Sequence, residues 1–259
     1  MISELTPVSA GADLIGRGLA LRFDGAGTIN VPGLALPAAD FVREGQAIPV
    51  VEAPASEAVL ERRKIKVITT ATSELLRSSN AEALIRQVLV DATGPALDRV
   101  MFGAGAADDE RPAGLLHGIA ALSPTASLTD DLATLIGAVA PVAGNGGVVL
   151  IASATQAVAI NLLPRVPYLV VASASLPAGV VIAVAINAMV SATDGPPAIE
   201  TSRSATLHEV DTSPAVDIGG GVIARPVRNL FQSDTVGLKL RWPLSWALRD
   251  PRGIAWMQR

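Results

Sequence analysis

The chain has 259 residues, of which 50% are hydrophobic and 17% charged, and its formal net charge is −4. This length and apolar content allow a buried core in one large domain or two modest ones and exclude a disordered chain. The negative charge and an aromatic content of 3% argue against a protein that neutralises phosphates or stacks bases. Cysteine is absent, which excludes disulfides, thiolate metal sites and cysteine nucleophiles.

The sequence predicts neither a membrane span nor a secretion signal. The longest nearly uninterrupted apolar stretch, Ala178 to Val190, is shorter than the roughly 20 residues of a transmembrane helix. The opening sequence MISELTPVSAGADL lacks a basic segment followed by an apolar one. We therefore expect synthesis and action in a cytoplasm, without a membrane partner.

The first 72 residues indicate extended structure. Residues 1–18 are small and polar without a sustained period, which predicts an extended arm that becomes ordered only against a neighbouring molecule. Residues 19–72 are rich in Gly and Pro and contain short extended runs, so we expect a long β-hairpin or an open β region. Strand propensity is high at Val50, Val51 and residues 59–70, and residues 43–46 (REGQ) offer a turn near the tip.

A long helix is predicted next. Ser79 stands three residues before Glu82, the spacing of a capping box over the first free amides of a helix. Apolar residues then recur at helical spacing over about six turns: Leu84, Ile85, Val88, Leu89, Ala92, Ala96, Leu97, Val100 and Met101. Gly94-Pro95 interrupts this stripe and is expected to bend the helix near Asp91 without ending it.

After a Gly-rich loop at residues 103–114, the pattern alternates between helices and buried strands. Thr129 is expected to cap a helix with Asp130 and Asp131 in its first turn, and Pro141 to stop it. The next elements are predicted from apolar runs and prolines as strand 148–152, helix 153–163 ended by Pro164, strand 168–172 and strand 180–190. Together they predict a compact α/β layer.

Near the end of the chain, Val236, Leu238, Leu240 and Trp242 alternate with Gly237, Lys239 and Arg241. This period of two predicts a strand with one buried face. All three tryptophans, Trp242, Trp246 and Trp256, lie in this last stretch, and we interpret them as core or interface anchors.

The residue types that carry chemistry form no catalytic constellation. His117 and His208 are far apart and have no partner at ligand spacing, so we interpret them as surface or hydrogen-bonded histidines rather than metal or catalytic ones. The Gly-rich segments 103–105 and 144–147 have the wrong context for a phosphate loop, because one follows a helix and the other precedes a strand. Both are interpreted as turns.

Two further groups are considered. Asp108, Asp109 and Glu110 offer three carboxylates for calcium, but without the alternating ligands of a dedicated loop; a solvated loop is the preferred interpretation. Lys64, Lys66 and Lys239 could serve a Schiff base or a Ser-Lys dyad, yet Lys64 and Lys66 alternate with apolar residues and are expected to point to solvent. No catalytic, cofactor-binding or metal-binding residue is therefore predicted.

Four stretches in this order resemble the major capsid proteins of tailed bacteriophages, with their Hong Kong 97-type α+β fold. Residues 41–50 (FVREGQAIPV) resemble the outward hairpin called the E-loop, whose return strand would include residues 63–67. Residues 73–79 (SELLRSS) resemble the lead-in to the long spine helix, and residues 111–116 (RPAGLL) the P-x-G-L loop that follows it. Residues 230–236 (LFQSDTV) resemble the late return into the P-domain.

The resemblance implies a division of the chain into an N-terminal arm, an E-loop region, a P-domain with the spine helix, an α/β A-domain and a C-terminal P-domain strand. The boundaries that it implies are residues 1–18, 19–71, 72–125, 126–228 and 229–259.

The function implied is that of a major capsid protein in the virion, assembled in a host bacterial cytoplasm. Copies would form hexamers and pentamers of an icosahedral head around double-stranded DNA, without sequence-specific DNA binding and without enzymatic activity or a cofactor. Partners would be other copies of the chain and a portal, scaffold or prohead protease.

The sequence departs from the family pattern in two ways. Many relatives begin with a long helical scaffolding segment, and none is evident here, which implies a processed form or a separate scaffolding protein. In some relatives, subunits are cross-linked by a Lys–Asn isopeptide bond whose lysine lies in the E-loop, but residues 19–63 contain no lysine here. Non-covalent clasping by hairpin and arm is therefore expected.

Two alternatives remain open from the sequence. An encapsulin-like compartment shares the fold but packages cargo enzymes. A hydrolase or binding enzyme of α/β type, using Ser, Asp and His208, belongs to another class; it would be a small oligomer with a concave polar pocket, whereas a shell protein forms particles.

Overall fold

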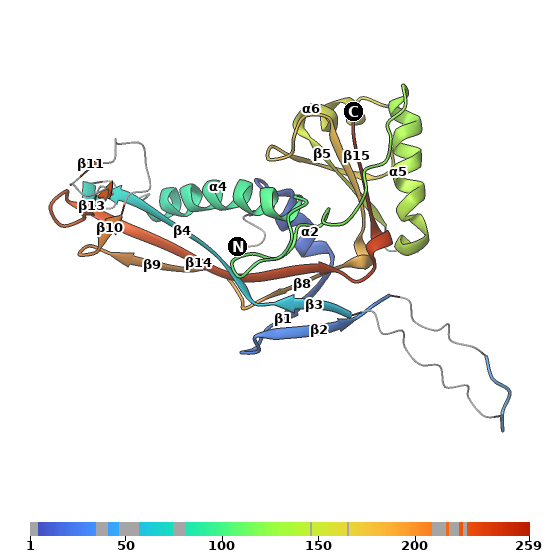
Figure 1. Ribbon diagram of the computed structural model, residues 1–259, viewed down its shortest axis with the longest axis horizontal. Helices are drawn as coiled ribbons and strands as arrows, with labels where there is room; N and C mark the ends of the chain where they lie inside the picture. Colours follow the sequence, from blue (N-terminus) through green and yellow to red (C-terminus); the bar gives the residue numbers. More distant parts are fainter. Residues whose placement is uncertain are drawn as a thin grey trace. The chain divides into compact units, whose positions relative to one another are not determined.

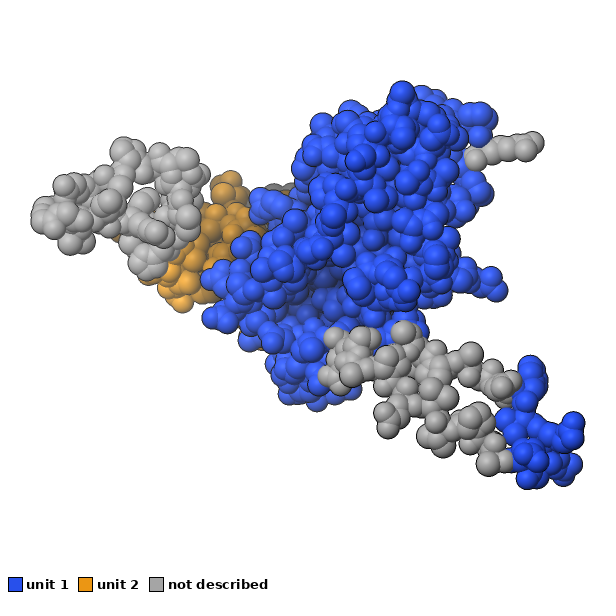
Figure 2. Space-filling model, turned by 45° about the vertical axis from the view of Figure 1, so that its right-hand side comes forward, with its two compact units in different colours: residues 1–65, 93–196, 242–259 blue, residues 66–92, 197–241 orange. Residues whose placement is uncertain are grey.

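The computed structural model describes residues 5–34, 41–46, 57–74, 81–145, 147–164, 166–208, 216–217, 223–224 and 227–259. The chain forms two compact units, coloured separately in Figure 2. Unit 1 comprises Met1–Ile65, Thr93–Pro196 and Trp242–Arg259, and unit 2 comprises Lys66–Ala92 and Pro197–Arg241. Among the helices described, none combines the length and apolar character needed to span a membrane.

Unit 1 contains a four-stranded mixed sheet, which confirms the predicted α/β layer (Figure 1). Its strands are β5 (Val148–Ser153), β6 (Leu169–Ser173), β7 (Val180–Ala185) and β15 (Ile254–Gln258), in the order β15-β7-β5-β6. β5 runs parallel to β6 and antiparallel to β7. Helices α5 (Leu128–Ala143) and α6 (Ala154–Asn161) bury apolar residues in one cluster with alternate residues of β5 and β7.

A second sheet has the order β1-β8-β14-β4. Its strands are β1 (Leu19–Arg22), β8 (Met189–Thr193), β14 (Thr235–Leu248) and β4 (Arg63–Thr72), and β9 (Ala198–Ser202) pairs with the first half of β14. The predicted closing strand is confirmed, and it is longer than expected. Trp242 is fully buried, and Arg241 beside it is exposed.

A β-hairpin of β2 (Thr28–Pro32) and β3 (Glu57–Glu61) packs on this sheet within unit 1. Its inward residues Val31, Ala58 and Leu60 share a cluster with Phe23, Val190 and Ala192. The base of the predicted hairpin therefore has an interior of its own. Val50 and Val51 lie outside the described residues.

The structure corrects the predicted strand 180–190. The apolar run splits into β7, a short 3₁₀ turn (Ile186–Ala188) and β8, and the two strands belong to different sheets. The turn is held by Asn187, whose side-chain amide donates to the carbonyl of Ala143 at 2.7 Å. Both strands are almost completely buried, so hydrophobic periodicity shows no break between them.

Helix α5 begins earlier and ends later in the chain than Thr129 and Pro141 suggest. Its N-cap is Ser127, not Thr129, since the Ser127 hydroxyl accepts from the amide of Asp130 at 3.3 Å. Pro141 lies inside the last turn and does not stop the helix, which ends at Gly144 with a positive φ of 49°. A proline near the C-terminus removes only one hydrogen bond, and packing of Val139 and Ala143 in the core offsets that loss.

The prediction of an extended arm at residues 1–18 is wrong for its second half. Residues Ala10–Arg17 form helix α2, capped by Ser9, and Leu5, Ala12, Leu14 and Ile15 are at most 2% exposed within the same chain. The spacing of Leu14 and Ile15 was too short a pattern to indicate a helix, because isolated helices of eight residues form only when tertiary contacts support them.

The tertiary support for α2 comes from helix α4 (Ala81–Met101) through the buried side chain of Asp98. Oδ1 accepts from the Ser9 hydroxyl at 2.5 Å and from the amide of Gly11 at 2.9 Å. Oδ2 accepts from the amide of Ala10 at 3.1 Å and from the Ser173 hydroxyl, on β6, at 2.5 Å. One carboxyl group thus joins α2, α4 and the four-stranded sheet.

Helix α4 continues through Gly94 and Pro95, as the sequence predicts. A Cβ on Gly94 would lie 2.9 Å from Cγ2 of Val8, so this glycine lets the segment before α2 approach the helix closely. The predicted capping box at Ser79 and Glu82 falls outside the described side chains, and the bend near Asp91 remains a prediction.

The described part of unit 2 contains the first part of α4, most of β4, which pairs with β14, and three further pairings. β9 pairs with β14, β10 (Thr206–His208) with β13 (Val227–Asn229), and β11 (Val216–Asp217) with β12 (Ile223–Ala224). Glu200 on β9 faces Lys239 on β14 at 3.1 Å, and the hydrogen bond from Lys239 lowers the pKa of Glu200.

We expect Asp98→Asn to destabilise unit 1 almost as much as Asp98→Ala. Each oxygen of Asp98 receives a fixed backbone amide, so either orientation of an asparagine places its NH₂ group against an amide donor. Leaving one of these buried amide donors unpaired costs about 1–3 kcal/mol. Denaturant unfolding measures the loss. Asp91→Asn, an exposed change on the same helix, is the control; equal stability of the Asp98→Asn protein and the wild type would contradict this account.

Candidate assembly surface

Residues 33–56, 24 in all, connect β2 to β3. Loops beyond about 12–15 residues in compact domains are uncommon and are usually functional. The described tip, residues 41–46, contains the predicted turn: the amide of Gln46 donates to the carbonyl of Arg43 at 3.1 Å, and Gly45 has a φ of 81°. Phe41 at this tip is fully exposed to solvent.

The loop after α4 folds back on the end of the helix. The amides of Leu115 and Leu116 donate to the carbonyls of Met101 and Gly103 at 2.7 and 3.2 Å. These bonds satisfy carbonyls that the last helical turn leaves without partners. A Cβ on Gly114 would lie 2.0 Å from the carbonyl oxygen of Gly103. The glycine of the RPAGLL stretch is therefore needed for this close approach.

Two tryptophans fix the same loop to both sheets of unit 1. The indole N–H of Trp246, on β14, donates to the carbonyl of Ala113 at 2.9 Å. The indole N–H of Trp256, on β15, donates to the carbonyl of Ile119 at 2.9 Å. The third, Trp242, donates to the carbonyl of Gly195 at 3.2 Å. Of the tryptophans predicted as core or interface anchors, Trp242 and Trp246 are buried in the core and Trp256 is half-buried, and each has a polar partner for its one donor.

A groove of about 380 Å³ lies beside this loop within unit 1. Its lining combines apolar residues of β3, the loop and β14 with the Glu61–Arg63 ion pair and His117. Arg63 also donates to the carbonyl of Asp109 at 2.9 Å. The charged groups of the lining are thus engaged with one another or with the backbone, which suits a contact surface better than a catalytic pocket.

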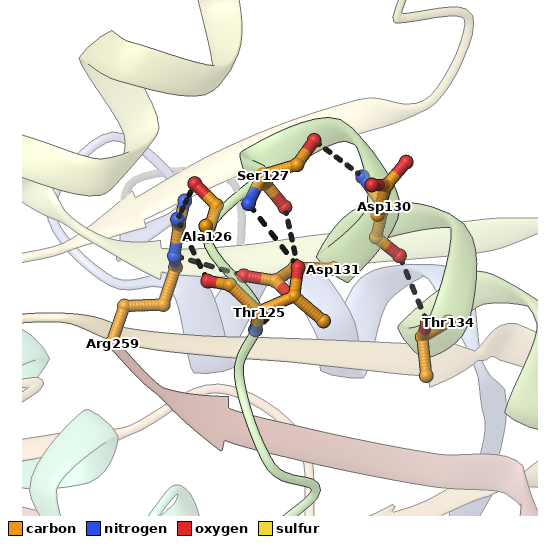
Figure 3. Close-up of polar contacts among 7 residues, drawn as sticks. All are labelled: Thr125, Ala126, Ser127, Asp130, Asp131, Thr134 and Arg259. Atoms are coloured by element: carbon orange, nitrogen blue, oxygen red, sulfur yellow. Dashed lines mark hydrogen bonds and ion pairs between the residues drawn. The ribbon is translucent and has the colours of Figure 1, made fainter.

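A buried carboxyl group closes the first turn of α5, as Figure 3 shows. Asp131 Oδ1 accepts from the amide and the hydroxyl of Thr125 at 2.6 and 2.7 Å, and Oδ2 lies 2.9 Å from Nε of Arg259. Burial by itself would raise the pKa of Asp131, but the hydrogen bonds from Thr125 and the charge of Arg259 hold it below its ordinary value. The segment before α5 and the strand β15 are joined here.

The residues considered for catalysis lie on different elements of the two units. His117 is exposed, and its Nδ1 lies 3.2 Å from the carbonyl oxygen of Ala104, in agreement with a hydrogen-bonded surface histidine. His208 is in β10 in unit 2, and its side chain is outside the described part. Lys64 and Lys66 are exposed on β4, as predicted, and Lys239 pairs with Glu200.

The candidate calcium loop stabilises itself instead. Asp108 accepts from the amides of Glu110 and Arg111, both at 2.9 Å, and from Nε of Arg111 at 2.8 Å. The backbone bonds, first that of Glu110, lower the pKa of Asp108. Across the described residues, no group of three or more potential ligands could hold a metal ion.

The sequence analysis did not identify Asp98 and Asp131 as the buried acids that join the elements of unit 1. Asp98 stands in the middle of an apolar stripe, and Asp131 looks like one of two dipole-compensating acids at a helix start. An isolated acid on the buried face of a predicted helix is itself a signal, because such a group is rarely buried without several partners. Those partners, Ser9, Ser173, Thr125 and Arg259, are distant in sequence and could not be identified.

We expect Gly114→Ala to lower stability by about 1–3 kcal/mol, because the added methyl group collides with backbone rather than with a flexible side chain. Thermal unfolding measures the loss. Gly105→Ala is the matched control in the same loop, since a Cβ there meets nothing within 4 Å. If the two substitutions have the same effect, close approach at Gly114 does not hold the loop.

We expect Asp131→Asn to lower the melting temperature near neutral pH and to have less effect in acid. A lowered pKa stabilises the folded state above the unfolded-state pKa, and this contribution disappears as the pH falls through the folded-state value. Circular dichroism melts at pH 7 and about pH 3 measure the change. Asp130→Asn serves as the neighbouring control. A deficit for Asp131→Asn that is independent of pH would contradict the ionic role.

The comparisons with known proteins concern the fold. No family model and no curated protein matches the chain. A chain of Microbacterium phage Oxtober96 is similar in structure, with a TM-score of 0.64 and 16% identity over 98% of this chain and 91% of that one. A chain of Mycobacterium phage Bobi has a TM-score of 0.64 and 17% identity over 95% and 89% of the two chains.

Two further similar structures are described as capsids. A chain from the capsid of an empty GTA particle has a TM-score of 0.59 and 11% identity, covering 97% of this chain and 90% of that one. A chain from the procapsid structure of satellite phage P4, which includes the size determination (Sid) protein, has a TM-score of 0.59 and 10% identity, covering 99% and 89%. The resemblance seen in the sequence is thus confirmed for the architecture, and the chain has the α+β fold of phage capsid proteins.

Proposed function

We propose that this chain is a major capsid protein, whose copies form the hexamers and pentamers of an icosahedral head around double-stranded DNA. The observation that carries the proposal is the similarity of its fold, over nearly its whole length, to chains of phage particles and capsids. The role is structural and not enzymatic, and it needs no cofactor.

The capsid parts are assigned as the sequence resemblance implies. Residues 1–18 are the N-terminal arm, 19–71 the E-loop region, 72–125 and 229–259 the P-domain, and 126–228 the A-domain. In this assignment α4 is the spine helix and the sheet with β5 and β7 is the core of the A-domain. The part of the arm from Leu5 to Arg17 is packed on its own chain, and Asp98 holds the start of α2.

The hairpin provides the main clasp between subunits. Its base is packed on its own chain, while its tip exposes Phe41 fully and Val42 by 37%. Laid over an adjacent subunit, such a tip buries apolar surface and loses conformational entropy, so each contact is modest, about −4 to −8 kcal/mol. Many equal contacts together hold a closed shell, while a single misplaced subunit can still dissociate.

The charge of the chain suits a container rather than a DNA-binding protein. A shell of proteins that each carry a net charge of −4 encloses DNA without binding its phosphates tightly. We place the protein in the virion, after assembly in the host bacterial cytoplasm. A portal and either a scaffold or a prohead protease are the further partners of the proposal.

Electron microscopy of the chain produced together with a scaffold and a protease tests this function, and we expect closed particles. A second protein, with residues 35–56 replaced by a short Gly-Ser turn, keeps the paired base β2–β3 and is expected to remain folded but to form no particles. Its melting temperature, compared with that of the wild type, is the control for folding. Absence of wild-type particles under these conditions would overturn the capsid proposal, and normal particles from the shortened protein would overturn the clasp.

A further inference from the structure

A second groove of about 310 Å³ lies within unit 1, beside the end of α4. Its walls come from the last turn of α4 and the loop after it, the turn between β6 and β7, and the end of β15. The apolar part of the lining includes Phe102, Leu116, Leu176, Val180 and Trp256. Phe102, Leu116 and Val180 are at most 5% exposed. The volume accommodates about ten non-hydrogen atoms, at about 30 Å³ for each water-sized group.

Hydrogen bonds hold both sides of this groove in place. In the turn between β6 and β7, the Ser175 hydroxyl donates to the carbonyl of Pro95 on α4 at 2.9 Å. The amide of Val180 closes the same turn by donating to the carbonyl of Pro177 at 3.2 Å. The loop on the other side is fixed by the backbone and indole hydrogen bonds described above. The groove is therefore preformed, and a ligand does not bear the entropic cost of ordering its own site.

Arg99 also lines this groove and brings a positive charge to it. It is exposed, and no described residue forms a hydrogen bond or an ion pair with its side chain. The adjacent carboxyl group of Asp98 does not neutralise it, because each oxygen of Asp98 already accepts two hydrogen bonds. A cation in the last turn of α4 is favourable for the helix dipole, but this interaction leaves the N–H donors of the guanidinium group free to bind a ligand.

We propose that this groove binds an aliphatic carboxylic acid of medium chain length in its ionised form. The chain packs on Phe102, Leu116 and Val180, and the carboxylate receives paired hydrogen bonds from Arg99, because a planar guanidinium group matches the two oxygens of a carboxylate. Octanoate, with about ten non-hydrogen atoms, has the size that the groove accommodates. The site lies within one chain, so it does not rest on the proposed capsid function.

Ligands with many polar groups fit this lining less well. Besides Asp98 and Arg99, its polar side chains are Ser175 and Gln258, and their donors already bond to the carbonyls of Pro95 and Ala178. A sugar, a nucleotide or the amides of a peptide would lose water in the groove and find few partners there. An apolar chain with a single charged end needs only the partner that Arg99 supplies.

Isothermal titration calorimetry of the full chain with octanoate tests the site, and octan-1-ol, which has the same chain without the charge, is the ligand control. We expect octanoate to bind at least about tenfold more tightly than octan-1-ol, because the alcohol loses a charge-assisted hydrogen bond. Arg99→Gln is expected to abolish this difference. Arg22→Gln, which changes an exposed arginine outside the groove, is expected to preserve it. Absence of octanoate binding, or equal binding by the Arg99→Gln protein and the wild type, would overturn the proposal.

The tryptophans report where octanoate binds. The chain has three, so incorporation of fluorinated tryptophan gives one fluorine resonance for each, and a Trp256→Phe protein assigns the signal of Trp256. We expect octanoate to shift this signal, because Trp256 lines the groove, and to leave that of the fully buried Trp242 unchanged. A shift confined to Trp246, which lines the other groove, would place the ligand there and refute the assignment.

A second variant tests the apolar wall and does not depend on Arg99. Leu176→Ser is expected to weaken the binding of both octanoate and octan-1-ol about tenfold. Leu19→Ser, at a position 42% exposed and outside the groove, is the matched control. The melting temperature of each protein without ligand shows that it is folded. Unchanged affinity of the Leu176→Ser protein for both ligands would contradict the proposal, as would tighter binding of N-acetyl-leucyl-leucine than of octanoate, which would favour a peptide as occupant.

Discussion

The buried carboxyl group of Asp98 is the interaction on which the organisation of unit 1 depends. It accepts hydrogen bonds from the hydroxyls of Ser9 and Ser173 and from the first amides of α2. Three segments more than 70 residues apart along the chain meet at this one group. Burying a carboxyl group is unfavourable unless its hydrogen bonds are complete. All four donors must therefore be in place together, which makes docking of the N-terminal helix cooperative with folding of the sheet.

The same chain combines this closely hydrogen-bonded core with exposed apolar side chains. Asp131 and the two indole donors of Trp246 and Trp256 fix the loop and strand ends around the sheets. By contrast, Phe41 near the tip of the hairpin and Leu162 after α6 are exposed. A closed shell of identical subunits needs both features, because packed cores keep the subunits alike and exposed apolar side chains supply contacts.

Much of this architecture could be predicted because it depends on local patterns. The alternation around Leu238 and Leu240, the existence of helix α4 and the Gly-rich loop after it were identified correctly. The buried face of α4 was predicted only in part, since Val88 and Ala92 are exposed and Val90 is buried. The errors have a common origin. Helix α2 was missed and the run 180–190 was taken as one strand because both depend on distant partners, Asp98 in one case and two separate sheets in the other. Sequence periodicity indicates which residues are buried, but not which other elements they pack against.

The position of the hydrogen bonds to Asp98 also determines how the N-terminal end of the chain can be altered. The hydrogen bonds that hold α2 begin at Ser9, and the turn that leads into it begins at Leu5, whose carbonyl accepts from the amides of Val8 and Ser9. Polypeptide added ahead of Leu5 leaves every one of these bonds intact, whereas trimming past Gly11 removes three of the four donors to Asp98. Leu5 is thus the natural junction for fusing a reporter or cargo peptide to this protein.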